Sequence, residues 1–196
     1  RCSVDMRVKY YKDNLNQDRM NVDNILGSLR NEDSKLSVLP TLTQINDPEI
    51  IQEIIELFDN DDIEIRGEVF STLFLNKNNI LKELIIGLDH KSKNVRAYLI
   101  LVLANRKEKD AIKEIKRLTN DSNGLVRTCA YGALGHLEVK EGKKELHEGI
   151  FDSNIEAVKS AAYALSRIGE KISQKEIEEL QSFNDQDFEK ILKLFN

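Results

Sequence analysis

Histidine and cysteine are the residues of this chain that could support metal binding or nucleophilic catalysis. The 196 residues include three histidines, His90, His136 and His147, and two cysteines, Cys2 and Cys129. No two histidines lie four positions apart, the spacing that would put two ligands on one helical face. A nucleophilic cysteine needs a base and a lowered pKa, and Cys129 has no such partner nearby in the sequence. The sequence therefore predicts no metal site, no cofactor and no catalytic residue, and we expect Cys129 to be a buried structural thiol.

A second group of candidates is a basic stretch between residues 91 and 117. Its members are Lys91, Lys93, Arg106, Lys109, Lys113, Lys116 and Arg117. Such a patch could bind the phosphate backbone of a nucleic acid or an acidic partner, although it could also be an ordinary solvated helix face. No base-stacking platform or groove-reading helix is recognisable beside it, and the whole chain has a formal charge of −5. Nucleic-acid binding is therefore an alternative and not our main prediction.

A third group of candidates could form a binding surface for another protein. Tyr98, Tyr131 and Tyr163 recur at similar intervals, and tyrosine is enriched at protein interfaces because it buries a large area and keeps a polar tip. Some of these rings could instead pack between helices. The full candidate set is Glu64, Glu68, Tyr98, Tyr131, His136, Tyr163 and Arg167.

The elements that carry these candidates repeat with a period of about 31 residues. One apolar column steps by 30 or 31 residues and consists of Leu42, Leu73, Leu103, Leu134 and Leu165. Mostly apolar residues also stand four and eight positions before each of these leucines, which places them on one stripe of a helix. A second column with the same period consists of Ile25, Ile55, Ile85, Ile115, Leu146 and Ile177. Two columns with one period predict a repeat of two antiparallel helices.

Local signals indicate where these helices begin and end. Asp47 before Pro48 is typical of a helix start, and Ser173 to Glu176 form a capping box. Pro40 should bend the second helix of the first pair or delay its start. No segment alternates with a period of two, so we expect no sheet. The expected pairs cover residues 21–45, 47–75, 77–105, 108–138 and 139–169, and two closing helices cover 174–182 and 186–195.

The sequence thus predicts one all-α domain, an α–α superhelix (solenoid) of about five helix pairs. The solenoid covers residues 21–169 and a C-terminal helical cap covers 170–196. Residues 1–20 are polar and without a clean period, so we expect a tail with one loose helix at about 8–15. The first methionine is Met6; either the native start lies upstream or, as we slightly favour, residues 1–5 are an artificial addition.

The repeat resembles the HEAT-like repeat, in the short form found in phycobilisome lyases and many prokaryotic proteins. The family pattern runs from an Asp through Val-Arg and two small residues to Ala-Leu-Gly and an aliphatic residue. The matching residues of the fourth pair are Asp121, Val126, Arg127, Ala130, Ala133, Leu134, Gly135 and Leu137. The fifth pair matches nearly as well between Asp152 and Gly169. The earlier pairs match only through Asp61 with Ile65-Arg66 and Asp89 with Val95-Arg96.

The resemblance implies a ladder of Asp–Arg pairs between neighbouring helix pairs. Its expected members are Arg66, Arg96, Arg127, Asp89, Asp121 and Asp152. A guanidinium can bind a carboxylate through two hydrogen bonds, so these pairs would set the stacking of the repeats. In the fifth pair Val158 takes the position of the arginine, with Lys159 beside it, and we expect the ladder to weaken there.

The resemblance is specific for fold and weak for function, because this repeat serves many roles. Stacked helix pairs form an extended groove, and the sequence holds no acid–base, metal or nucleotide motif. We therefore predict a non-enzymatic scaffold that binds another protein through its concave helical surface. A lyase-type enzyme that uses the same groove for a small molecule, or a nucleic-acid binder acting through residues 91–117, are the alternatives.

The location and assembly of the protein can also be addressed from the sequence. It contains no secretory signal and no run of 18 apolar residues, so we expect a cytoplasmic protein that does not enter a membrane. Repeat stacks expose apolar end faces unless they are capped. We expect a monomer, or weak self-association through residues 1–30 or 183–196.

Overall fold

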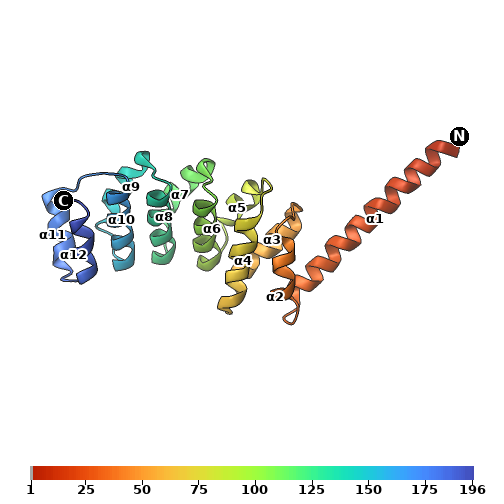
Figure 1. The fold of residues 1–196 in the computed structure, drawn as a ribbon, viewed down its shortest axis with the longest axis horizontal. Coiled ribbons are helices and arrows are strands. Elements are labelled where there is room, and N and C mark those ends of the chain that lie inside the picture. The colour runs from red at the N-terminus through yellow and green to blue at the C-terminus, as the bar shows by residue number, and fades with distance from the viewer. Residues whose placement is uncertain (1) are drawn as a thin grey trace. The chain divides into compact units, whose positions relative to one another are not determined.

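The structure is all-helical throughout its described part. The computed structural model describes the backbone of residues 2–196 and the side chains of residues 6–196, and every regular element in this range is a helix (Figure 1). The all-α prediction is therefore confirmed for these residues. The expectations for the side chain of Cys2 and for residues 1–5 lie outside this part of the chain.

The helices follow one another in the predicted order. The α-helices are α1 (Cys2–Arg30), α2 (Lys35–Val38), α3 (Pro48–Glu56), α4 (Ile63–Leu75), α5 (Leu81–Gly87), α6 (Lys93–Asn105), α7 (Ile112–Leu118), α8 (Gly124–His136), α9 (Lys143–Gly149), α10 (Ile155–Arg167), α11 (Gln174–Ser182) and α12 (Gln186–Lys193). Short 3-10 helices are η1 (Leu39–Leu42), η2 (Leu57–Asp59), η3 (Lys109–Ala111) and η4 (Lys140–Gly142).

These helices divide into two compact units, Arg1–Ile80 and Leu81–Asn196, here called unit 1 and unit 2. In unit 1, α1 packs on α2 and α3, and α4 packs on α2, η1 and η2. In unit 2, α6, α8 and α10 lie side by side, α5, α7 and α9 pack against them, and α12 packs on α10 and α11 (Figure 1). The predicted succession of helix pairs is confirmed, whereas the expected chain division at residues 20 and 169 stays a prediction.

A polar N-cap residue in extended conformation precedes the second helix of four pairs, namely α4, α6, α8 and α10. The side chain of this residue accepts a hydrogen bond from a backbone N–H of the first turn, which stabilises a helix by about 1 kcal/mol. The caps are Asp62 before α4, Ser92 before α6, Asn123 before α8 and Asn154 before α10. The capping box of Ser173 and Glu176 is present at the start of α11. The boundaries of the repeats thus follow from local side-chain chemistry.

The first helix pair is the irregular one. At Leu39 the short helix α2 passes into η1, with Pro40 in the first turn of this 3-10 helix, because proline cannot continue the hydrogen bonds of an α-helix. The expectation of a loose helix at residues 8–15 was wrong, since α1 is one continuous helix. No glycine or proline interrupts residues 2–26, and the buried side chains of Leu26 and Leu29 anchor its C-terminal end.

The predicted apolar columns form the core. Leu42, Leu73, Leu103, Leu134 and Leu165 are all at most 4 % exposed. In the second column Ile55, Ile115 and Leu146 are buried, whereas Ile25, Ile85 and Ile177 are partly exposed. Burying such a side chain contributes about 1.5–3 kcal/mol. The stacking of helix pairs is therefore the main source of stability, because neither helix of a pair can cover its own stripe.

Small residues allow α8 and α10 to approach closely. A Cβ atom added at Gly135 would lie 2.7 Å from the Cβ and 2.8 Å from the Cα of Ala164. A Cβ at Gly149 of α9 would similarly lie 2.6 Å from the Cβ of Ala161. Both glycines therefore occupy positions where the neighbouring helix leaves no room for a methyl group.

We expect Gly135→Ala to destabilise the protein by about 1–3 kcal/mol, because it forces α8 and α10 apart in a packed core. Gly67→Ala in α4 is the matched control, since a Cβ there meets nothing within 4 Å. In an exposed helix interior this change should stabilise by about 0.5–1 kcal/mol. Urea unfolding followed by circular dichroism measures both effects, and equal shifts for the two variants would contradict the packing argument.

Candidate functional site

Two bidentate ion pairs join neighbouring helix pairs of unit 2. Arg96 of α6 donates from Nε to Oδ2 of Asp121 at 2.9 Å and from Nη2 to Oδ1 at 3.0 Å. Arg127 of α8 makes the same two bonds to Asp152, both at 2.8 Å. The two carboxylates are only 8 % and 6 % exposed. Such a forked, desolvated geometry is the strong form of this interaction.

Each ladder arginine also holds the turn that precedes its own helix. Its Nη1 donates to two consecutive backbone carbonyls in that turn. The acceptors are Asn60 and Asp61 for Arg66, His90 and Lys91 for Arg96, and Asp121 and Ser122 for Arg127. In turn, Oδ1 of Asp121 and of Asp152 accepts from the backbone N–H two residues later. One arginine in unit 2 therefore fixes two turns at once.

The electrostatics of these carboxylates suit an ion pair. Burial alone would raise the pKa of Asp121, but the hydrogen bonds from Arg96 and the backbone outweigh it and hold the pKa below its usual range. The same balance lowers the pKa of Asp152. The hydrogen bond with Asp152 raises the pKa of Arg127. A general acid needs the opposite shift of a carboxyl pKa, so these residues have a structural and not a catalytic environment.

The ion pairs at the two ends of unit 2 differ from the buried, bidentate pairs between them. Asp89, an expected ladder member, accepts a 2.8 Å hydrogen bond from Arg117 in a largely exposed pair. At the position next to Val158, Lys159 contacts Asp187 at 3.1 Å and Asp185 at 3.7 Å. A lysine offers a point charge in place of a fork. The cap formed by α11 and α12 is therefore joined to α10 by single contacts and not by bidentate ones.

The side of α6, α8 and α10 opposite the core forms a continuous face of unit 2, which we call the second-helix face. Equivalent residues of the three helices share this face because they repeat at i, i+4, i+7 and i+11. They are Asn94, Tyr98, Leu101 and Asn105 in α6, Leu125, Cys129, Gly132 and His136 in α8, and Glu156, Ser160, Tyr163 and Arg167 in α10.

Four of the predicted binding residues lie on this face, and one does not. Tyr98 is partly exposed and His136, Tyr163 and Arg167 are exposed, whereas Tyr131 is only 4 % exposed. Its register places Tyr131 toward the core, and its hydroxyl lies 3.4 Å from both the carbonyl of Thr119 and the carboxylate of Asp152. Tyr131 is therefore a packing residue, which corrects its assignment to the binding surface.

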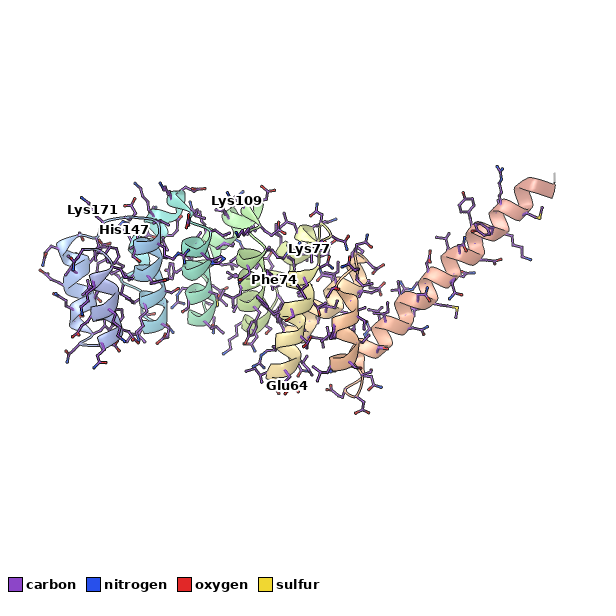
Figure 2. The ribbon with its side chains drawn as sticks, in the orientation of Figure 1. Glu64, Phe74, Lys77, Lys109, His147 and Lys171 are labelled. Carbon is purple, nitrogen blue, oxygen red and sulfur yellow. The ribbon has the colours of Figure 1, made fainter. Side chains whose placement is uncertain are left out.

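Cys129 also lies on the second-helix face and is partly exposed. Burial raises the pKa of its thiol to about 11, so it is protonated near neutral pH and is a weak nucleophile. The two remaining binding candidates lie in α4 of unit 1. Glu64 is exposed near the start of the helix (Figure 2), and Glu68, one turn later, is partly buried.

The basic stretch does not form one patch. Lys91 and Lys93 lie at the start of α6, whereas Arg106 and Lys109 follow its end, about 18 Å away for a helix of this length. Carboxylates also pair with several of these cations. Those pairs are Arg106 with Glu108, Lys116 with Glu145, and Arg117 with Glu114 and Asp89.

A basic pocket does form where α6, α8 and α10 end. Its volume is about 310 Å³, and it is lined by Lys107, Lys109, His136, Leu137, Glu138 and Arg167. Figure 2 shows Lys109 in the turn that follows α6. The pocket brings together Lys109 from the predicted basic stretch with His136 and Arg167 from the predicted binding set. Sequence reasoning did not place Lys107 there, although the equivalence of the turns after α6 and α8 could have indicated it.

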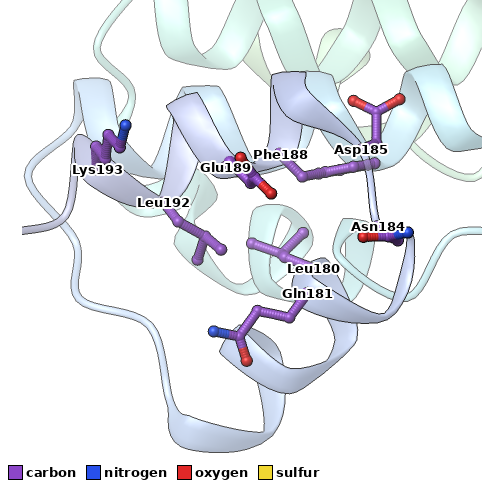
Figure 3. A pocket seen from close by; sticks show the side chains of 8 residues that line it. All are labelled: Leu180, Gln181, Asn184, Asp185, Phe188, Glu189, Leu192 and Lys193. Atoms are coloured by element: carbon purple, nitrogen blue, oxygen red, sulfur yellow. The ribbon is translucent and has the colours of Figure 1, made fainter.

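Another hollow lies between the last two helices. Figure 3 shows the side chains around it, from Leu180 of α11 to Lys193 of α12, and its volume is about 360 Å³. Leu180, Phe188 and Leu192 form its apolar part, and Phe188 stacks on Phe183 with ring centroids 4.6 Å apart. Beside this cap, Nδ1 of His147 in α9 pairs with the buried Glu176 of α11. The cap thus packs on α10 through its helix α12 and is joined to α9 by the His147–Glu176 contact.

Among residues 6–196, whose side chains the structure describes, no group of three or more His, Cys, Asp or Glu residues could hold a metal ion. None of the helices described for the same residues is both long and apolar enough to cross a membrane.

The repeated ladder, caps and packing of unit 2 agree with a known family. Residues 81–166 match the family model of HEAT repeats. The resemblance inferred from the sequence is thereby confirmed, and the matched HEAT repeats begin at the same residue as unit 2. No curated protein matches the sequence.

Several solved structures share this fold at low sequence identity. A computationally designed armadillo repeat protein for modular peptide recognition is 18% identical, covers 88% of this chain and 99% of its own, and superposes with a TM-score of 0.55. An engineered protein is 18% identical with a TM-score of 0.54, covering 87% of this chain and 95% of its own. A designed armadillo repeat protein in complex with the peptide (KR)4 is 16% identical with a TM-score of 0.51, covering 88% and 98%. These similarities concern the fold.

We expect Arg96→Ala to lower the free energy of unfolding by roughly 1–3 kcal/mol, because it leaves the buried carboxylate of Asp121 without its partner. Lys113→Ala, at an exposed position of α7, is the control and should change little. Urea midpoints of the two variants and the wild type test this expectation. An unchanged midpoint for Arg96→Ala would contradict a stabilising role of the Arg96–Asp121 pair.

The lowered pKa of Asp152 predicts a pH-dependent effect for Asp152→Asn. A carboxyl whose pKa is lower in the folded state adds stability above its unfolded pKa of about 3.9, and this stability is lost as pH falls through the folded value. The variant should therefore be less stable than the wild type at pH 7, and the gap should narrow below about pH 4. Unfolding free energies at pH 7 and pH 3 measure it, with the exposed Asp110→Asn as control; a gap independent of pH would contradict it.

Proposed function

We propose that this chain is a non-enzymatic repeat scaffold that binds a segment of another protein on the second-helix face of unit 2. The observation that carries this proposal is the exposure of apolar and aromatic side chains on that face. Leu125 is 45% and Tyr163 is 49% exposed, and Tyr98 and Leu101 are partly exposed beside them. Single exposed apolar residues are common on protein surfaces, whereas a group on one face is typical of an interaction site.

The residues of this face have the properties of interface anchors. Tyrosine and leucine bury a large area, and tyrosine keeps a hydroxyl for a hydrogen bond. Gly132 stands between Leu101 and Tyr163 at the equivalent position of the middle helix and has no side chain to fill the space. Because Gly135 and Ala164 let α8 and α10 pack closely, we expect the spacing of these helices to be set before a partner binds. Preorganisation of this kind lowers the entropic cost of association.

The comparisons support the proposal at the level of fold. A designed armadillo repeat protein with a related fold holds the peptide (KR)4, so stacked helix pairs can provide a surface for a peptide. The pairing of several cations of the basic stretch with carboxylates weakens the case for a nucleic-acid partner. For a lyase-type activity, the lowered pKa values of Asp121 and Asp152 offer no general acid. A cytoplasmic location and a monomeric state stay predictions.

Selection of peptides from a displayed random library against the purified chain tests the proposal. The affinity of the selected peptides is then measured by fluorescence polarisation for the wild type and for Leu125→Ser/Tyr163→Ser. We expect at least tenfold weaker binding by this variant, about 1.4 kcal/mol, because it removes two apolar contacts.

The control variant is Ile86→Ser/Phe151→Ser, which changes apolar residues of similar exposure outside the second helices, at 54% and 44%. It should bind the selected peptides like the wild type. Failure to select any saturable binder, or equal losses in the two variants, would overturn the assignment of the binding function to this face.

A further inference from the structure

We propose that the basic pocket at the ends of α6, α8 and α10 binds a negatively charged group of the partner segment, a phosphate or a pair of neighbouring carboxylates. This inference rests on the proposed function and names the chemistry of the partner: an acidic or phosphorylated peptide. The pocket lies at the C-terminal edge of the second-helix face, because His136 and Arg167 belong to both. A segment lying on the face can therefore reach the pocket.

The basic side chains of the pocket are not needed to complete the helix ends. Lysine and arginine near a C-terminus often serve the last carbonyl groups of a helix, but here the backbone does so. After α6, the N–H of Lys107 donates to the carbonyl of Ala104 and that of Glu108 to Leu103. After α8, the N–H of Glu138 donates to Gly135 and that of Val139 to Leu134. The side chains around the pocket are therefore available for another role.

The charge of the pocket is unbalanced. Three permanent cations, Lys107, Lys109 and Arg167, and His136 face one carboxylate, Glu138. Among the described residues neither lysine has a carboxylate within ion-pair distance, and Arg167 reaches Glu138 only at 3.7 Å, with both side chains well exposed. Exposed pairs of this kind contribute little stability, so an incoming anion can compete with Glu138 for Arg167 at small cost.

The surroundings of the pocket indicate how much negative charge a ligand needs. Three helix C-termini meet at this edge, and each carries a partial negative charge that weakens the attraction for an anion. A single carboxylate therefore gains little, whereas a phosphate or a pair of neighbouring carboxylates gains from several cations at once. The pocket of about 310 Å³ has room for such a group. We infer a partner motif in which apolar or aromatic residues for the face adjoin an acidic or phosphorylated residue.

A peptide series with one apolar segment and four different ends tests this inference. The ends are phosphoserine, two glutamates, serine and two lysines, and binding to the full chain is measured by fluorescence polarisation. We expect the phosphoserine and glutamate peptides to bind at least tenfold more tightly than the serine peptide, and the lysine peptide to bind more weakly than the serine one. Comparison of the phosphoserine peptide with the glutamate peptide distinguishes a phosphate ligand from a carboxylate ligand. Equal affinities for the four peptides would overturn the inference.

The pocket variant is Lys109→Glu/Arg167→Glu, and the matched control is Lys82→Glu/Lys113→Glu, which changes the net charge equally at exposed positions of α5 and α7. The pocket variant should lose the preference for acidic peptides at least tenfold, and the control should keep it within twofold. Retention of the preference by the pocket variant would overturn the inference. If Leu125→Ser/Tyr163→Ser weakens all four peptides while the pocket variant changes nothing, the proposed function stands and the pocket assignment falls. If the pocket variant loses the preference for acidic peptides while Leu125→Ser/Tyr163→Ser binds all four peptides like the wild type, the pocket assignment stands and the proposed function of the face falls.

Two probes without a peptide complete the test. Titration with inorganic phosphate, followed by amide chemical shifts of the labelled chain, should perturb the signals of Lys107, Lys109 and His136 in a saturable way, and perturbations spread evenly over the surface lysines would contradict a defined site. A single-stranded oligonucleotide should bind more weakly than the phosphoserine peptide. Tighter, pocket-dependent binding of the oligonucleotide would overturn the assignment to a protein partner.

Discussion

The repeats of unit 2 depend on one interaction, the forked hydrogen bonds from an arginine of one helix pair to an aspartate of the next. Arg127 illustrates its reach, because the same guanidinium holds the carbonyls of its own entry turn and the carboxylate of Asp152. Asp152 in turn orders the entry turn of α10 through the N–H of Asn154. A desolvated carboxylate is costly unless it is fully paired, so the neighbouring repeat has essentially one favourable position. The apolar columns provide most of the energy, and the ladder defines how the turns meet.

This arrangement separates the tasks of the second helices. One side of each helix is committed to the core, and its small residues determine how near the next helix lies, as Gly135 and Ala164 do. In α6 and α8 the ladder arginine lies within the first two turns, and backbone hydrogen bonds close the C-terminal turn of each helix. The exposed side chains of the second-helix face, such as Leu125 and Tyr163, take no part in the core or the ladder. Positions of this kind can vary without changing the repeat geometry, which explains how one repeat can serve many roles.

The sequence predicted those features that repeat. The two apolar columns and the arginines of the ladder recur every 30 or 31 residues, so each of these positions was indicated by its equivalents. The orientation of Tyr131 could not be read in the same way, because its equivalents Ile100 and Ala162 are core residues, while the interval between tyrosines suggested a surface column. The length of α1 was missed because its exposed first half has no apolar period, and only its last turns are anchored by Leu26 and Leu29. The basic pocket joins turns about 30 residues apart, so only the equivalence of these turns, and no local pattern, could have indicated it.

The turns around the pocket also carry residues that the backbone alone does not favour. The chain passes through the left-handed region at Lys107, Glu138 and Gly169, with φ of 57°, 54° and 74°. Only glycine adopts this conformation without steric cost, and another residue is disfavoured there by roughly 1–2 kcal/mol. The turn after α10 has Gly169 at the equivalent position, so glycine is compatible with the geometry of this turn. Lys107 and Glu138 instead place a charged side chain at the rim of the pocket. A fold under no other requirement would gain stability from glycine at both positions, and the positive charge of Lys107 is consistent with a role in binding an anion and not in folding.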